Sequence, residues 1–266
     1  TGFRPVLTTT CYTLYEPEDG RRIVLIDWRQ FDMVMIRSDL DSLTSWARRH
    51  DRLGHDVIVD ATRSEGGAYA DLLVRTLVDR PFQGMKCNLR ISNLRAALTQ
   101  KAIRHYGDPS PQVEWYRNDV AQAAAQGLEY APPVPLRLHG ERGGIVQPAP
   151  VHFSGRLVCL LGPPGGSSLD QFAALVIDNR LGHAIGMPTS GYSNAWEWDE
   201  VVEFPNGQPV ARYSWSVGYS IRPNGEILEG NPAIPQELVP LTRANFSNYH
   251  EQLLARALAY LSRPAG

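Results

Sequence analysis

Two short apolar segments, each followed by a glycine-rich turn and a helical pattern, constrain the fold more than any other feature of the sequence. Residues 57–61 are rich in β-branched side chains and lead into a turn at residues 64–67. Residues 156–161 lead in the same way into a turn at residues 162–166. Apolar strands that alternate with helices indicate β-α-β units and a parallel sheet covered on both faces. We therefore expect an α/β fold.

The same patterns predict the neighbouring elements. Strands are expected at residues 23–28 and 183–187, and Asn206-Gly207 predicts a hairpin between residues 201–204 and 210–213. The β-rich pattern then continues toward the C-terminus. Helices are expected at residues 40–52, 69–78, 113–126, 168–179 and 246–261, and Asn245 is expected to cap the last of them.

Residues 107–150 differ from the rest of the chain because they contain seven prolines and a single helical pattern. We interpret this stretch as an insertion or lid within one domain that spans residues 1–266. A simple connector is an equally good interpretation, because proline-rich loops commonly serve only to join elements.

The composition excludes several classes of function. The formal charge of −2 does not indicate the excess of basic residues that is typical of proteins that bind nucleic acid. No apolar window is long enough to cross a membrane. Three scattered cysteines suit neither a disulfide framework nor a zinc site, and no cofactor is expected. The start of the chain has no pattern of a signal peptide. Of the 26 basic residues, only Lys86 and Lys101 are lysines.

The turn at residues 165–168 places two serines before a predicted helix. A phosphate-binding loop would need a lysine there, and a G-x-S-x-G elbow would need a glycine where Leu169 stands, so both interpretations fail. The remaining options are a helix cap, which the segment alone favours, and a nucleophile whose oxyanion is stabilised by amides at the helix N-terminus. The turn at residues 60–67 ends a parallel strand and is expected at the same sheet edge, where its glycine amides can supply a second donor.

Four motifs resemble those of the S41 peptidases and follow one another in the same order as in that family. The family includes carboxy-terminal processing, tricorn-core and chlamydial-factor-like proteases. Residues 160–173 (LLGPPGGSSLDQFA) are similar to the segment LVGPGTASAAEIFA, which carries the family's nucleophilic serine. Residues 60–67 (DATRSEGG) resemble DLRGNGGG. Residues 177–191 and 223–240 resemble the family's later motifs, so the resemblance covers about residues 23–80 and 155–240.

The resemblance implies a ClpP/crotonase-like layered β-sheet with flanking helices and a β-rich C-terminal part, in a single catalytic domain. It implies a serine peptidase that acts through an acyl-enzyme on Ser167, with the amides of Gly66 and Ser168 as oxyanion hole. Gly67 replaces Gly66 if the turn is shifted by one residue. The implied partner is a peptide or protein substrate, and the family favours a secreted or periplasmic location.

The sequence differs from the family at the positions that carry the general base. Tyr192 stands where the Ser-Lys branch has its lysine, and no lysine follows Lys101. A phenol is a poor base at neutral pH. Asp27 stands where the tricorn-like branch has a histidine, whereas Glu229, or less favourably Glu226, matches that branch's assisting glutamate.

Other histidines are poorer or conditional candidates. The helix after Ser167, about 12 residues at 1.5 Å each, places His183 about 18 Å from it, and Asp178 is excluded in the same way. His105 and His139 become candidates only if the insertion folds over the cleft. No stretch of the chain resembles a PDZ module.

Three functions follow from these observations. The first is an active serine peptidase with an unassigned base, and the second is a catalytically impaired relative that binds peptides. The third, least favoured, is a crotonase-like enzyme of acyl thioesters. Trp196, Trp198, Trp215 and Tyr219 are expected either to pack the β-rich end, which is favoured, or to form a peptide groove.

Overall fold

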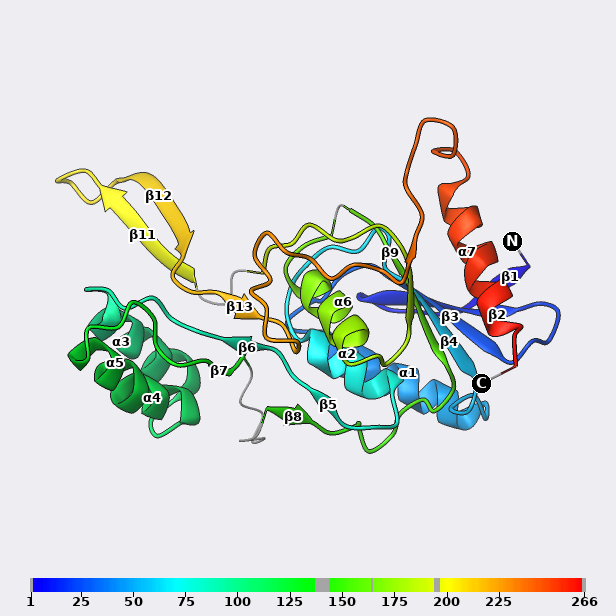
Figure 1. Ribbon diagram of the computed structural model, residues 1–266, viewed down its shortest axis with the longest axis horizontal. Coiled ribbons are helices and arrows are strands. Elements are labelled where there is room, and N and C mark those ends of the chain that lie inside the picture. Colours follow the sequence, from blue (N-terminus) through cyan, green and yellow to red (C-terminus); the bar gives the residue numbers. More distant parts are fainter. Residues whose placement is uncertain (1, 137–143, 164, 194–196, 265–266) are drawn as a thin grey trace.

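A seven-stranded mixed sheet forms the centre of the computed structural model, which describes residues 2–136, 144–163, 165–193 and 197–264 (Figure 1). The strand order is β1-β2-β3-β4-β9-β10-β14. The first two pairs are antiparallel, and the remaining pairs are parallel. The strands are β1 (Phe3–Thr8), β2 (Tyr12–Pro17), β3 (Ile23–Trp28), β4 (Asp56–Asp60), β9 (Leu157–Leu161), β10 (His183–Gly186) and β14 (Glu237–Leu238).

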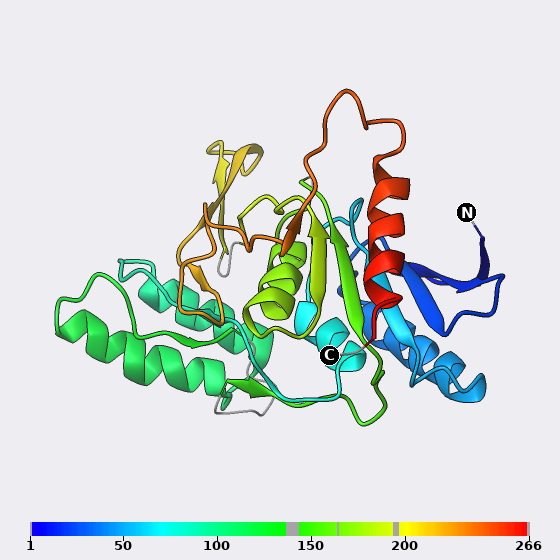
Figure 2. The same cartoon turned by 45° about the vertical axis from the view of Figure 1, so that its right-hand side comes forward.

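Helices cover both faces of this sheet (Figure 2). On one face, Val59 and Cys159 pack in a core with α1 (Ile36–Arg49), α2 (Ala70–Leu77) and α6 (Ser168–Asp178). On the other face, Ile58 packs in a second core with α7 (Tyr249–Leu261). Alternate residues of β4 and β9 thus meet helices on opposite sides, which explains their continuous apolar runs. The predicted α/β class, with a layered sheet and flanking helices, is confirmed.

The two glycine-rich turns leave the sheet at one edge, as the parallel arrangement predicts. Strands β4 and β9 are parallel neighbours, and Asp60 lies opposite Leu160 in their register. The turn after Asp60 leads to α2, and the turn after Leu161 leads to α6. The candidate catalytic segments are therefore brought together by strand pairing.

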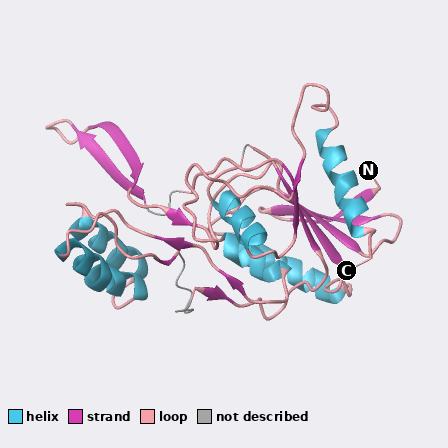
Figure 3. Cartoon of the chain, in the orientation of Figure 1, coloured by secondary structure: helices cyan, strands magenta, loops and turns pink. Residues whose placement is uncertain are grey.

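A helical lobe and a long hairpin project from this layered core (Figure 3). The lobe has its own apolar core, to which Leu98, Val113 and Val120 belong. It begins before the proline-rich stretch, and the expected helix at residues 113–126 is observed as a run of three segments. The elements of this part are β5 (Phe82–Gln83), β6 (Lys86–Cys87), α3 (Arg95–Tyr106), α4 (Pro111–Trp115), the π-helix η1 (Tyr116–Val120), α5 (Ala121–Ala125), β7 (Val134–Pro135), β8 (Ile145–Val146), β11 (Glu197–Glu203), β12 (Pro209–Ser216) and β13 (Ser220–Ile221).

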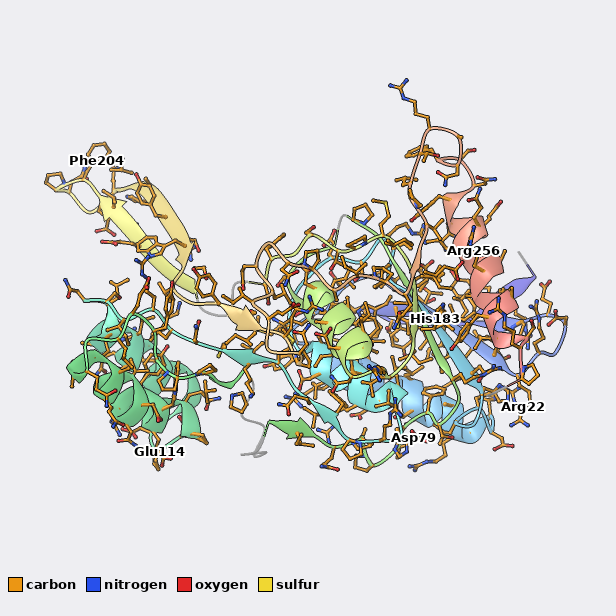
Figure 4. The ribbon with its side chains drawn as sticks, viewed as in Figure 1. Arg22, Asp79, Glu114, His183, Phe204 and Arg256 are labelled. Atoms are coloured by element: carbon orange, nitrogen blue, oxygen red, sulfur yellow. The ribbon has the colours of Figure 1, made fainter. Side chains whose placement is uncertain are left out.

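Of the aromatic residues expected at the β-rich end, the two whose side chains are described, Trp215 and Tyr219, have different surroundings. Trp215 lies on β12 and is exposed, whereas the Tyr219 ring lies 5.3 Å from that of Tyr130 in the connection to the lobe. Trp196 and the side chain of Trp198 lie outside the described residues. The predicted hairpin is confirmed, and Phe204 marks its exposed tip (Figure 4).

The expected cap of the last helix is wrong. Helix α7 begins at Tyr249 after Asn248, not at Phe246 after Asn245. The side-chain oxygen of Asn245 accepts hydrogen bonds from the amide and hydroxyl of Thr242, so it closes the preceding turn instead. No helix in the described part of the chain is long and apolar enough to span a membrane.

A buried ion pair ties the C-terminal loops to α6. The Arg222 guanidinium donates to both carboxylate oxygens of Asp178, at 2.6 and 3.0 Å, and the two side chains are 6% and 4% exposed. Arg222 also donates to the carbonyl of Asn231 at 3.2 Å. Asp178 therefore has a structural partner at the far end of the helix from Ser167.

A second polar pair joins the edge of the sheet to α7. The buried Asp60 accepts a hydrogen bond from His250 and further bonds from the amide and hydroxyl of Thr62. Burial opposes ionisation of Asp60, but these hydrogen bonds outweigh it and lower its pKa. The hydrogen bond to Asp60 raises the pKa of His250 above its ordinary value, against the effect of partial burial.

We predict that His250→Gln destabilises the protein in a pH-dependent manner. The raised pKa of His250 stabilises the fold fully below the unfolded value of about 6.5, and this contribution is lost as the pH rises through the folded pKa. The lowered pKa of Asp60 stabilises the fold above about pH 4, and this contribution is lost in stronger acid. Denaturant unfolding at a series of pH values should show the largest difference from wild type between about pH 4 and 6.5. A difference that does not vary with pH would contradict the pairing.

Candidate active site

Ser167 occupies an unusual backbone conformation at the start of α6. Its φ of 58° and ψ of −120° are rare for any residue other than glycine, and such strain is concentrated at functional sites. The Ser167 amide donates to the carbonyl of Tyr192 at 2.7 Å. The Ser167 side chain makes no capping hydrogen bond. The Ser168 hydroxyl donates to the carbonyl of Gly67 at 2.7 Å, so the interpretation of these serines as simple helix caps is wrong.

The turn after β4 approaches Ser167 too closely to carry a side chain. A Cβ placed on Gly66 would lie 2.8 Å from the Ser167 Cβ and 3.4 Å from its Oγ. Gly67 has a φ of +131°, and a Cβ there would lie 2.0 Å from the carbonyl oxygen of Phe31. Both positions therefore require glycine. Phe31 holds the turn by donating to the carbonyl of Gly66 at 3.1 Å and accepting from Ala68 at 2.9 Å.

This arrangement leaves backbone donors beside the Ser167 hydroxyl. Within the described part of the chain, the amides of Gly66 and Gly67 donate no hydrogen bond. The amide of Ser168 belongs to the first turn of α6, where N–H groups have no acceptor within the helix. Amides of this kind can bind an oxyanion, and the positive end of the helix dipole adds to the effect.

Asp170 fixes the loop that follows β10 against the first turn of α6. This fully buried carboxylate accepts hydrogen bonds from the amides of Gly191 and Tyr192, at 2.9 and 3.0 Å, and from the hydroxyl of Thr189. Burial raises the pKa of Asp170, although the hydrogen bonds act in the opposite direction. One turn later, the side-chain amide of Gln171 donates to the hydroxyl of Ser193 at 2.6 Å. The Tyr192 carbonyl accepts the hydrogen bond from the Ser167 amide. It is therefore held in place by Asp170 on one side and by the contact between Gln171 and Ser193 on the other.

Tyr192 lies beside the turn that carries Ser167. A Cβ on Gly166 would lie 2.5 Å from the Tyr192 ring and 3.0 Å from its phenol oxygen. The ring packs on the glycine that precedes Ser167, and the side chain remains half exposed. The structure thus brings together Ser167, Gly66, Ser168 and Tyr192, four of the residues that the sequence singled out.

Glu229 is connected to the same loop through the backbone. Both of its carboxylate oxygens accept a hydrogen bond from the Ser220 amide, at 3.0 and 3.1 Å, and the next residue, Gly230, donates to the carbonyl of Gly191 at 2.6 Å. Glu226 instead accepts bonds from Asn224 and Asn231 in an exposed turn. Neither carboxylate is recorded in contact with Ser167.

The other candidate bases are held at different places. Asp27 pairs with Arg63 at 3.4 Å and shares a cavity with His250, on the face of the sheet that α7 covers. His183 stacks on Tyr260 of α7, 4.1 Å between ring centres, and Figure 4 shows it on that side of the molecule. His105 belongs to α3 of the lobe, and its side chain lies outside the described residues, as does the whole of His139. No group of three His, Cys, Asp or Glu side chains in the described ranges could hold a metal ion.

Sequence reasoning missed the role of Asp170. From its position in the first turn of a helix, an acidic residue is predicted only to interact favourably with the helix dipole. The sequence offers one further signal, the full burial implied by the apolar residues around it. Its actual partners, Gly191 and Tyr192, follow a separate strand and become neighbours only in the folded chain.

We predict that Asp170→Asn lowers the free energy of unfolding by about 1–3 kcal/mol. The side-chain NH₂ group of asparagine replaces a carboxylate oxygen, so a backbone amide or hydroxyl of the loop that donates to this oxygen loses its acceptor. The same substitution at the exposed Asp79 is the control and should have little effect. Denaturant unfolding at pH 7 measures both. Equal stabilities of the two variants would show that the carboxylate does not hold the loop.

Solved structures named as a peptidase or a protease are among those with a similar fold. The chain superimposes on mature CPAF with a TM-score of 0.64 and 18% identity, over 94% of this chain and 52% of that one. A candidate peptidase from Parabacteroides merdae gives a TM-score of 0.62 and 13% identity, over 100% and 68% of the two chains. A candidate S41 protease from Bacteroides fragilis gives a TM-score of 0.50 and 12% identity, over 98% and 57%.

These similarities lie in the structure rather than in the sequence. No protein-family model matches the chain, and no curated protein does. The chain spans about half the length of mature CPAF. The resemblance that the four motifs suggest is confirmed at the level of architecture, and the chain has an S41-like peptidase fold.

Proposed function

We propose that this protein hydrolyses peptide bonds through an acyl-enzyme formed on Ser167. The observation that carries the proposal is the Ser167 hydroxyl itself, which caps no helix and lies next to Gly66 at a strained turn. An unused hydroxyl, presented beside unused amides, fits a nucleophile with its oxyanion hole.

The reaction requires the Ser167 Oγ to attack the substrate carbonyl and to give its proton to a base. The resulting oxyanion receives hydrogen bonds from the amides of Ser168 and Gly66, with Gly67 as the alternative donor. Collapse breaks the C–N bond, and the amine leaves with the transferred proton. Water then hydrolyses the ester and regenerates the hydroxyl.

The second element of this mechanism is the group that receives the Ser167 proton. Tyr192 is the titratable residue that the structure places beside the turn of Ser167. We propose that its phenol orients the hydroxyl and relays the proton: it takes the Ser167 proton while it gives its own to solvent water, which reaches the half-exposed side chain. Glu229 supports the same loop through its hydrogen bond from Ser220 and the bond from Gly230 to Gly191.

A peptide-binding protein without catalytic activity is the second candidate. It is favoured by one observation: no lysine or histidine is recorded in contact with Ser167 within the described ranges. The two candidates use the same site around Ser167 and differ only in whether the bound peptide is cleaved.

We predict that the wild-type protein cleaves members of a mixed peptide library and that Ser167→Ala lowers the rate at least about 1,000-fold, because the covalent step is lost. Ser42→Ala, on the exposed face of α1, is the matched control and should retain full activity. Mass spectrometry of the products measures the rates. Cleavage that survives in Ser167→Ala would disprove the nucleophile, and binding without cleavage by the wild type would favour the second candidate.

A further inference from the structure

The β11–β12 hairpin projects from the layered core as a sheet of two strands (Figure 1). In the chain it follows the loop of Tyr192 and Ser193, and it ends before Ser220, whose amide donates to Glu229. Within the described part of the chain, none of residues 200–216 belongs to an apolar core. A two-stranded sheet on its own is only marginally stable in water, and a further surface packed on it would stabilise it.

One face of this hairpin is apolar and exposed. Side chains at alternate positions of a strand point to the same face, so those of Tyr213 and Trp215 lie together. In the register of the hairpin, Val202 lies opposite Ala211 and Glu200 lies opposite Tyr213, which places them on this face as well. The side chains of Val202, Tyr213 and Trp215 are 44%, 55% and 39% exposed. We call Val202, Ala211, Tyr213 and Trp215 the aromatic face. Apolar side chains exposed together are typical of surfaces that bind other proteins.

The hairpin is also strongly acidic. Residues 197–216 contain four acidic residues and one basic residue, a formal charge of −3, whereas the whole chain has a formal charge of −2. The rest of the chain therefore carries +1. Two copies joined through their hairpins would bring charges of −3 against each other, which disfavours a second copy of this chain as the partner. A positively charged partner is favoured instead, because opposite charge both speeds the encounter and stabilises the complex.

The aromatic face can bind a cationic side chain directly. The faces of tyrosine and tryptophan rings attract a lysine ammonium or an arginine guanidinium group, so Tyr213 and Trp215 provide two such positions. The exposed Glu200, opposite Tyr213, lies where it can neutralise the same cation. Val202 and Ala211 continue the face as an apolar surface without charge. The face therefore fits a segment that contains both basic and apolar side chains.

We propose that the aromatic face of the β11–β12 hairpin binds a basic, apolar segment of another protein. Lysine or arginine side chains of this segment lie over Tyr213 and Trp215, and its apolar side chains cover Val202 and Ala211. The acidic residues of the hairpin attract the segment over a longer range. The interaction requires no reaction at Ser167, so it goes beyond the proposed function.

The test measures peptide binding to the Ser167→Ala protein, so that no probe can be cleaved. Three labelled ten-residue peptides alternate valine with lysine, valine with glutamate, and serine with lysine. We expect fluorescence anisotropy to show that the valine-lysine peptide binds at least about 10-fold more tightly than the other two, because it alone matches both the charge and the apolar surface. Added salt should weaken this binding, because it screens the charges.

Variants in the hairpin locate the binding site. Tyr213→Ser combined with Trp215→Ser should weaken binding of the valine-lysine peptide at least about 10-fold. Glu200→Gln combined with Glu203→Gln removes no apolar contact and should weaken it at least about 3-fold, with a smaller dependence on salt. Matched controls lie outside the hairpin and should leave binding unchanged. These are Phe246→Ser, which is 74% exposed before α7, and Glu251→Gln on the exposed side of α7.

The other outcomes overturn the proposal in distinguishable ways. Absence of binding by the valine-lysine peptide, or binding that the hairpin variants leave unchanged, would remove the aromatic face as the site. Binding of the serine-lysine peptide with equal affinity would show attraction by charge alone, and preference for the valine-glutamate peptide would reverse the chemistry of the partner. A dimer in sedimentation equilibrium that Trp215→Ser abolishes would show that a second copy covers the face. None of these results bears on the nucleophile, because Ser167 is replaced throughout.

Discussion

The contact between two backbone turns at one edge of the sheet is the constraint on which the candidate site depends. Gly66 lies so close to Ser167 that a methyl group would not fit between them. This contact exists because β4 and β9 are parallel neighbours that end together. Strand pairing thus brings a hydroxyl to unused amides, although more than 100 residues separate them in the chain. Ser167 has its positive φ of 58° at this same contact.

Buried carboxylates keep this contact rigid. Asp170 holds the loop after β10 to the first turn of α6, and Asp178 holds the following loops to its last turn through Arg222. Each carboxylate faces its own set of donors, which is the condition under which a buried charge is tolerated. Helix α6 therefore serves as the support of the site as well as the carrier of Ser167.

The elements with strong local signals could be predicted from the sequence, and those fixed by distant partners could not. The apolar runs of β4 and β9 and the Asn-Gly turn of the hairpin have signals within a few residues. The cap of α7 was misjudged because Asn245 is as well suited to a turn as to a helix start. In the candidate site, motif order singled out Ser167 and Gly66, which the structure places next to each other. The roles of Asp170 and Gln171 depend on a loop 20 residues away, and no local pattern reveals such a partner.

The central claim is that the fold activates one hydroxyl among all the serines of the chain. Reaction with a fluorophosphonate probe, followed by peptide mapping in the mass spectrometer, tests it most directly because labelling needs an activated nucleophile and no knowledge of the substrate. We predict a single adduct on Ser167, and none in the Ser167→Ala protein. An adduct on another residue, or none on the folded wild type, would contradict the claim.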